Sequence, residues 1–104
     1  MARNNAARLL ENPEPSSPAS IERGKTAYGA YCVFCHGEGG RGDGPIAAKL
    51  VFPPPNLPVT MQRYTDGYLY ATIRNGGAIM PPQGYRTTRQ ERWDMVNYLR
   101  SIQQ

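Results

Sequence analysis

Apolar residues recur three or four positions apart in three stretches of the chain, and this spacing predicts three amphipathic helices. The first covers about residues 18–35, the second starts at Asp66 and the third follows Thr88. Their apolar positions are Ile21, Gly24, Ala27, Tyr28 and Tyr31; Leu69 and Ile73; and Met95, Tyr98, Leu99 and Ile102. A fourth, short helix is expected within residues 45–50. The pattern therefore predicts an all-α fold of about four short helices without a sheet.

Residues that start and stop helices bracket these stretches. The expected N-terminal caps are Ser17 or Ser20, Thr65, and Thr88 with Glu91 in a capping box. Asn75, Gly76 and Gly77 provide a stop for the second long helix. The glycines within 37–44 and the prolines within 53–58 exclude regular structure. Long loops should therefore join the helices.

Length and composition indicate one small domain. With 104 residues, of which 39% are apolar, the chain buries only a modest core unless a bound group fills its centre. Eleven glycines and ten prolines fit a chain that is rich in turns. Residues 1–17 carry several Asn, Pro and Ser residues, which predicts a flexible N-terminal tail or tether. Residues 18–104 are then the folded domain.

The candidate chemistry lies in one pentapeptide. Cys32, Val33, Phe34, Cys35 and His36 form C-x-x-C-H and use both cysteines and the only histidine of the chain. This spacing attaches a c-type haem: two thioethers hold the porphyrin, and the imidazole ligates its iron. A structural zinc site needs four nitrogen or sulfur ligands, and only three are present. A thiol redox pair would be expected beside a βαβ pattern, which is missing.

A second iron ligand would decide the chemistry, because an open position permits ligand binding and a filled one favours electron transfer. The candidates are Met1, Met61, Met80 and Met95. Met80 is favoured because glycines before it permit a chain reversal and two prolines directly after it stiffen the loop. Met61 is the next candidate ligand, although it could instead fill a gap in the core. Met95 is better explained as a core residue.

These motifs together resemble a class I monohaem cytochrome c. The resemblance covers roughly residues 18 to 102 and rests on C-x-x-C-H, on Met80 followed by proline, and on a closing helix that contains Tyr98 and Leu99. It implies a class I cytochrome c fold wrapped around one covalent haem c, with His36 and Met80 as iron ligands. It also implies that Gly24 and Tyr28 cross the last helix near Met95 and Tyr98. The Pro45 carbonyl should then accept a hydrogen bond from Nδ1 of His36.

A finer similarity concerns the monohaem cytochrome c subunit of bacterial alternative complex III. Gly42, Asp43, Gly44 and Pro45 after the haem motif, the proline-rich middle, and Met80, Pro81 and Pro82 are similar to that subunit. This similarity implies a periplasmic protein, anchored to the membrane through an N-terminal segment upstream of the chain. The anchor cysteine of such proteins is missing here. The domain itself is expected to be soluble, because no apolar run reaches the roughly 18 residues of a membrane span. It is also expected to be monomeric.

The resemblance implies a one-electron carrier and no catalytic residues. Its redox partners would be a quinol-oxidising complex or dehydrogenase on one side and a haem-copper oxidase or soluble carrier on the other. Candidates to donate hydrogen bonds to the haem propionates are Asn56, Tyr64, Tyr68, Tyr70 and Tyr85. The alternative is a haem-based ligand sensor or peroxidase in which Met80 is labile. Carbon monoxide binding by the reduced protein separates the two.

Charge adds a preference in partners. The formal net charge is +4, and residues 1–20 contribute none of it, so the excess lies on the folded part. Four basic residues are candidates to surround the haem edge and steer acidic redox partners: Lys49, Arg74, Arg86 and Arg89. No basic cluster or basic stripe interleaved with aromatic residues is present, so nucleic-acid binding is not expected.

Overall fold

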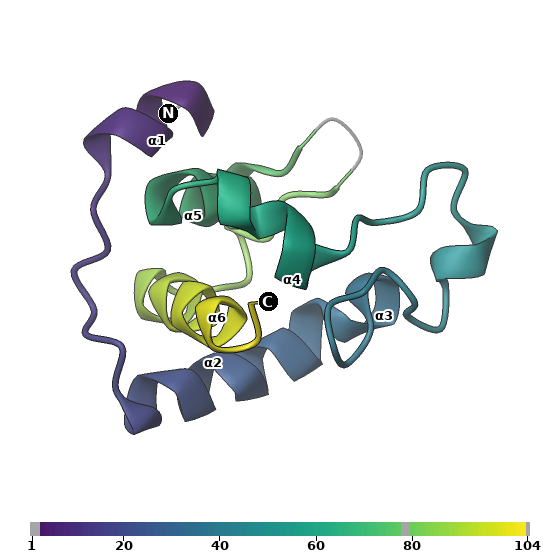
Figure 1. The fold of residues 1–104 in the computed structure, drawn as a ribbon, viewed down its shortest axis with the longest axis horizontal. Coiled ribbons are helices and arrows are strands. Elements are labelled where there is room, and N and C mark those ends of the chain that lie inside the picture. Colours follow the sequence, from purple (N-terminus) through teal and green to yellow (C-terminus); the bar gives the residue numbers. More distant parts are fainter. Residues whose placement is uncertain (1–2, 78–79, 104) are drawn as a thin grey trace.

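The computed structural model describes residues 3–77 and 80–103, and its described part is built from helices without strands (Figure 1). The α-helices are α1 (Arg3–Leu9), α2 (Pro18–Tyr31), α3 (Val33–His36), α4 (Leu57–Thr60), α5 (Asp66–Asn75) and α6 (Arg89–Ser101). Two 3₁₀ turns, η1 (Ala47–Lys49) and η2 (Met61–Arg63), lie in the loops. The all-α prediction is confirmed. The described residues form six α-helices where about four helices were expected. The helices α1 and α4 carry no clear periodic signal, α3 is separated from the helix expected over 18–35, and the short helix expected within 45–50 is the 3₁₀ turn η1.

The predicted helix starts are confirmed. Ser17 caps α2 by accepting a hydrogen bond from the Ser20 amide at 3.1 Å. Thr65 caps α5 in the same way, and Thr88 with Glu91 forms the complete capping box of α6. The long helix expected over 18–35 is split, because Cys32 ends α2 and α3 begins at the next residue.

Two long helices cross at a glycine. A Cβ atom on Gly24 of α2 would lie 2.0 Å from the Asp94 carbonyl oxygen of α6. The lack of a side chain therefore lets the two backbones touch, as the sequence predicts. Further along the two helices, the Tyr28 and Tyr98 rings pack with their centroids 5.3 Å apart. Figure 1 shows α6 lying across α2, with α5 on the other side of α6.

The core fills the space between these helices. Tyr70 of α5 stacks on Trp93 of α6 at 4.1 Å between ring centroids. The remaining buried members of this cluster are Ala27, Tyr28, Cys32, Met61, Leu69, Ile73, Met95, Val96, Tyr98 and Leu99. Met61 and Met95 are 0% and 1% exposed. The interpretation of Met95 as a core residue is therefore confirmed, and the burial of Met61 agrees with its alternative role of filling a gap in the core.

The N-terminal segment lies on the folded part of the molecule. Ala6 of α1 is buried, and a Cβ on Gly67 of α5 would lie 2.2 Å from its carbonyl oxygen. After α1, residues 10–17 form an extended segment, called the strap, which passes α5 and α6 to reach α2 (Figure 1). Asn12 in this strap donates a hydrogen bond to Asn97 Oδ1 at 2.7 Å. The predicted flexibility of residues 1–17 remains a prediction about motion.

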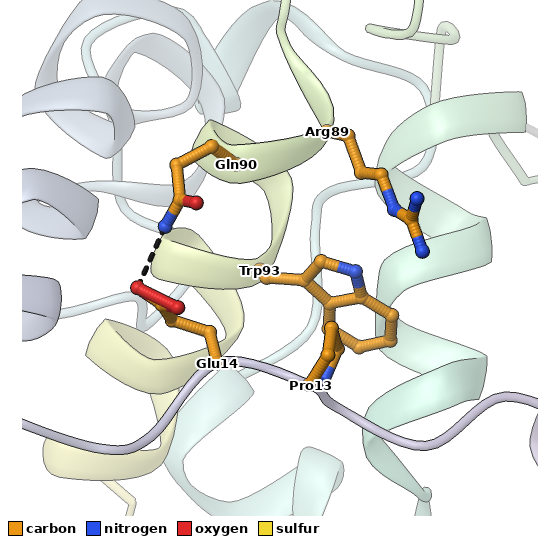
Figure 2. A pocket seen from close by; sticks show the side chains of 5 residues that line it. All are labelled: Pro13, Glu14, Arg89, Gln90 and Trp93. Carbon is orange, nitrogen blue, oxygen red and sulfur yellow. Dashed lines mark hydrogen bonds between the residues drawn. The ribbon is translucent and has the colours of Figure 1, made fainter.

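A shallow pocket of about 500 Å³ separates the strap from the start of α6. Figure 2 shows Pro13 and Glu14 on the strap facing Gln90 and Trp93, with Arg89 at the rim. Gln90 spans it by donating a hydrogen bond to Glu14 at 2.8 Å. None of the residues predicted to bind a cofactor lines this pocket.

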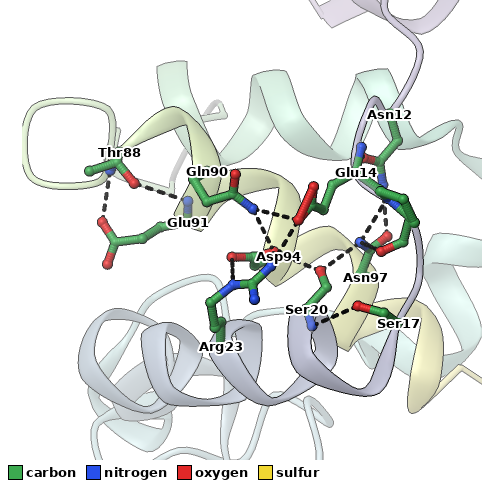
Figure 3. A network of polar contacts seen from close by, with 11 residues as sticks. Asn12, Glu14, Ser17, Ser20, Arg23, Thr88, Gln90, Glu91, Asp94 and Asn97 are labelled. Carbon is green, nitrogen blue, oxygen red and sulfur yellow. Dashed lines mark hydrogen bonds and ion pairs between the residues drawn. The ribbon is translucent and has the colours of Figure 1, made fainter.

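Polar residues join the strap, α2 and α6 around Asp94 (Figure 3). The Asp94 carboxylate accepts hydrogen bonds from Ser20 at 2.6 Å, from Arg23 at 2.9 Å and from Gln90 at 3.0 Å. Asn97 donates to Ser20 at 2.8 Å and so extends the network toward Asn12. Each of three segments thus contributes to one connected set of hydrogen bonds.

Candidate functional site

The C-x-x-C-H motif forms a single helical turn at the end of α2. The Cys32 amide still bonds to the Tyr28 carbonyl at 2.8 Å, and the Cys32 carbonyl in turn accepts the His36 amide at 3.0 Å. Both cysteines are free thiols, Cys32 buried and Cys35 half-buried. Burial raises the pKa of the Cys32 thiol to about 12. The buried Cys32 thiol therefore keeps its proton at neutral pH.

His36 lies at the end of this turn in a form suited to bind a metal. Burial lowers the pKa of its imidazole, so the ring is neutral at neutral pH, which is the state that ligates iron. Its Nδ1 atom is buried and has no hydrogen-bond partner among the described residues. Two free thiols and a neutral imidazole at the spacing of this motif fit a covalently attached haem.

The loop after His36 folds back over α3. The amides of Gly42, Gly44 and Ile46 donate to the carbonyls of His36, Cys35 and Phe34 at 2.9, 3.2 and 3.1 Å. A Cβ on Gly44 would lie 2.1 Å from the Phe34 carbonyl oxygen, so only glycine permits this approach. Pro45 stands between two of the bonded residues and is thereby brought next to α3. The bond from His36 Nδ1 to the Pro45 carbonyl is not formed and stays a prediction.

Tyr28 fixes the end of this turn from α2. Its hydroxyl donates a hydrogen bond to the Gly37 carbonyl, and Gly37 itself has a φ of +79°. Burial raises the pKa of Tyr28, so the phenol keeps the proton that it donates. The sequence assigned Tyr28 only to the helix crossing, and its second role depends on a residue nine positions away.

Met80 is half-buried in the loop between α5 and α6. Its carbonyl accepts the Gly77 amide at 3.1 Å. Gly76 has a φ of +79°, and a Cβ there would lie 2.6 Å from the Met80 carbonyl oxygen. These glycines produce the predicted chain reversal, although residues 78 and 79 lie outside the described residues. Met1, another candidate ligand, also lies outside them.

Tyr64 and Asn56, expected near the propionates, lie on other elements. Tyr64 follows η2 and stacks on Tyr68 at 4.2 Å. Asn56 is exposed at the N-cap of α4, with no capping bond from its side chain. No hydrogen bond or ring contact joins either residue, or Met80, to His36 within the described residues. The structure thus gathers Cys32, Cys35, His36 and Pro45, while the roles of the other three remain predictions.

Arg86, one of the basic residues expected to surround the haem edge, is a neighbour of the motif. Its guanidinium lies 5.1 Å from the Tyr31 ring centroid and donates to Gln83 Oε1 at 2.6 Å. Its positive charge lowers the pKa of Cys32, although burial outweighs it. The sequence did not indicate its contact with Tyr31 or its effect on Cys32, because the chain brings Arg86 back to α2 only through tertiary packing.

Large apolar side chains are exposed around the motif and in the loops after it. They are Phe34, Ile46, Val51, Phe52 and Val59, with exposed fractions from 39% to 87%. Apolar surface of this extent suits contact with a cofactor or a partner. In the described part of the chain, no helix is long and apolar enough to cross a membrane. Nor do those residues include a group of three or more His, Cys, Asp or Glu side chains placed to hold a metal ion.

Comparison with known proteins agrees with this geometry. Residues 19–99 match the family described as cytochrome C oxidase, cbb3-type, subunit III. A chain of the reducing HAO-like protein complex of Kuenenia stuttgartiensis is similar in structure, with a TM-score of 0.76 and 27% sequence identity. The similarity covers 91% of this chain and 50% of that one, so this chain spans about half the length of the relative. No curated protein matches the sequence. Since the family match includes the whole C-x-x-C-H turn and the loop of Met80, the chain belongs to the cytochrome c oxidase, cbb3-type, subunit III family and is a cytochrome c electron-carrier domain.

Proposed function

We propose that this domain carries single electrons in a bacterial respiratory chain through one haem c, whose iron His36 and Met80 would ligate. The observation that carries this proposal is the helical C-x-x-C-H turn, with two free thiols beside a neutral imidazole. A haem bound there would supply one-electron iron chemistry. Such a carrier needs no catalytic acid, base or nucleophile.

The chain's own residues would hold the geometry constant between oxidation states. Cys32 and Cys35 would attach the porphyrin, and the Tyr28 bond to Gly37 keeps the turn that carries them in place. The buried core around Met95, whose Sδ lies 4.0 Å from Cys32 Sγ, excludes water from one side. A dry site and a thioether ligand both favour the ferrous state and so raise the reduction potential.

Location and partners follow from the same proposal. We place the domain on the periplasmic side, free or anchored through an upstream segment, as in the monohaem subunit of alternative complex III. Its donor would be a quinol-oxidising complex or a dehydrogenase, and its acceptor a haem-copper oxidase or a soluble carrier. The net charge of +4 supports acidic partner surfaces.

The axial ligand can be tested with methionine variants of the holoprotein. We expect the oxidised wild type to show the weak near-infrared band of a sulfur to ferric iron bond, and the reduced protein to resist carbon monoxide. Met80→Ala should lose the band and bind carbon monoxide rapidly. Met61→Leu and Met95→Leu, which conserve volume in the core, should keep both properties. Survival of the band in Met80→Ala would exclude Met80, and rapid carbon monoxide binding by the wild type would favour the sensor.

A further inference from the structure

Within the part of the chain that the structure describes, Arg92 is a buried cation without an acidic partner. Its residue surface is 8% exposed, and the ion pairs of the described chain involve Arg23 and Arg100 but not Arg92. Its Nε atom is buried and has no hydrogen-bond partner among the described residues. Burying a guanidinium without a counter-ion costs free energy, so a gain elsewhere must offset it.

The guanidinium binds neutral groups from two directions. Nη1 donates to the Thr87 carbonyl at 2.7 Å and to the Thr87 hydroxyl at 3.2 Å. Nη2 donates to the Tyr70 hydroxyl at 3.2 Å, and the guanidinium carbon lies 5.2 Å from the centroid of that ring. Arg92 of α6 is thereby linked both to α5 and to the turn that precedes α6. A planar fork can reach both at once, whereas a single ammonium group cannot.

That turn is the far end of the Met80 loop. The Gln83 amide bonds to the Ile73 carbonyl at 2.9 Å, and the Gly84 amide bonds to the Arg74 carbonyl at 3.0 Å. The Thr87 hydroxyl closes the turn by donating to the Gln83 carbonyl at 2.6 Å. Gln83 follows Met80 after only two prolines, so any shift of this turn is passed on to Met80 through a stiff connection.

We propose that Arg92 is a positioning residue for Met80. Its hydrogen bonds to Thr87 and Tyr70 fix the turn over residues 83–87, and this turn keeps the Met80 sulfur where it would bind the iron. This inference rests on the proposed axial role of Met80. A weak thioether bond depends on loop rigidity, because an exogenous ligand competes for the iron whenever the loop opens.

The test measures how easily imidazole displaces Met80 in the ferric holoprotein, followed by loss of the near-infrared sulfur band. Loss of hydrogen bonds to a charged group should raise the imidazole affinity of Arg92→Met by about tenfold or more. Arg92→Lys should show most of this gain, because it keeps the charge but loses the fork. Arg89→Met, an exposed arginine of the same helix, should bind imidazole as the wild type does.

A second variant distinguishes a specific effect on the Met80 loop from a general loss of stability. Asp94→Asn weakens the polar network on the α2 side of α6, away from the Met80 loop. It should lower the free energy of unfolding without raising the imidazole affinity. If Arg92→Met binds imidazole as the wild type does, or no better than Asp94→Asn at equal loss of stability, the positioning role is wrong.

Two further outcomes keep the proposals distinct. If Arg92→Met does not yield holoprotein, Thr87→Val replaces it as the test, because it removes the hydrogen bond that the Thr87 hydroxyl accepts from Arg92 and the one that it donates to Gln83. This variant should raise the imidazole affinity by roughly two- to fivefold. An unchanged imidazole affinity would overturn the inference. If wild type and Met80→Ala bind imidazole equally, Met80 is not a ligand and the proposed function itself fails. A normal Met80 band with an unaffected Arg92 variant would refute only the positioning role.

Discussion

Asp94 shows how one buried carboxylate joins distant parts of the chain. Its burial raises the pKa of the group, but the hydrogen bonds from Arg23, Ser20 and Gln90 outweigh burial and hold the pKa below its ordinary value. Arg23 and Ser20 come from α2, and Gln90 precedes Asp94 by one turn of α6. The charged form of Asp94 therefore stabilises the contact between α2 and α6.

The pH dependence of stability follows from that direction. Because the folded-state pKa of Asp94 lies below the unfolded value of about 3.9, its contribution is complete above that value and is lost as pH falls through the folded-state pKa. Asp94→Asn should lower the free energy of unfolding at pH 7 by about 1 to 3 kcal/mol and flatten its fall in acid. Denaturant unfolding of the ferric holoprotein from pH 7 downward measures both. Glu22→Gln, at an exposed position of α2, is the matched control, and an Asp94→Asn curve parallel to that of the wild type would contradict the prediction.

Among the elements, the crossing of α2 and α6 depends most on a single residue. Gly24 lies directly under the Asp94 carbonyl, so the distance between the two helices is set by the absence of a side chain. Gly67 of α5 does the same for α1, because a Cβ there would meet the carbonyls of Ala6 and Leu10 at 2.2 and 2.6 Å. Helix contact in this domain is thus specified by glycines on two different helices.

Two glycines of α2 offer a paired test. Gly24→Ala should destabilise the holoprotein by about 1 to 3 kcal/mol or more, because the helices must move apart. Gly29→Ala, on the same helix, places its Cβ where nothing lies within 4 Å and should stabilise by up to about 1 kcal/mol through helix propensity. Thermal unfolding followed by circular dichroism measures both variants. Equal effects of the two substitutions would show that the close approach at Gly24 is unimportant.

For the whole molecule, the amount of apolar burial is the limiting quantity. Only 39% of 104 residues are apolar, and five large apolar side chains around the C-x-x-C-H turn and its following loops remain exposed. The helices of the α2, α5 and α6 cluster share one core, whereas α3 and the loop after it contribute little to it. A covalently held haem would cover this less buried part of the domain.

Removal of the attachment residues tests this dependence. Cys32→Ala/Cys35→Ala should not retain covalent haem and should lose much of its helical circular dichroism and its cooperative unfolding, because a small domain lacks enough core of its own. The comparison is with wild-type holoprotein prepared in parallel. Full native helicity with a cooperative transition in the double variant would show that the polypeptide folds without its cofactor.

Short-range chemistry explains what could be predicted from the sequence. The caps at Ser17, Thr65 and Thr88 depend on a side chain and an amide three residues away, so the residues themselves determine them. The C-x-x-C-H turn is local in the same sense, as is the reversal at Gly76. The helix α1 was missed because Ala6 is buried by packing against α5, where Gly67 permits a close approach of the two backbones that no periodic pattern reveals.

The amino-acid sequence by itself therefore determined the helix starts, the motif that identifies a haem attachment turn, and the glycine needed for the main helix crossing, since each acts through neighbouring residues or through its own lack of a side chain. Only the tertiary structure decided that α1 lies on α5, that Arg86 lies near Cys32, and that Arg92 joins Tyr70 to Thr87. These contacts link residues far apart along the chain, and packing selects them among many partners of equal chemistry.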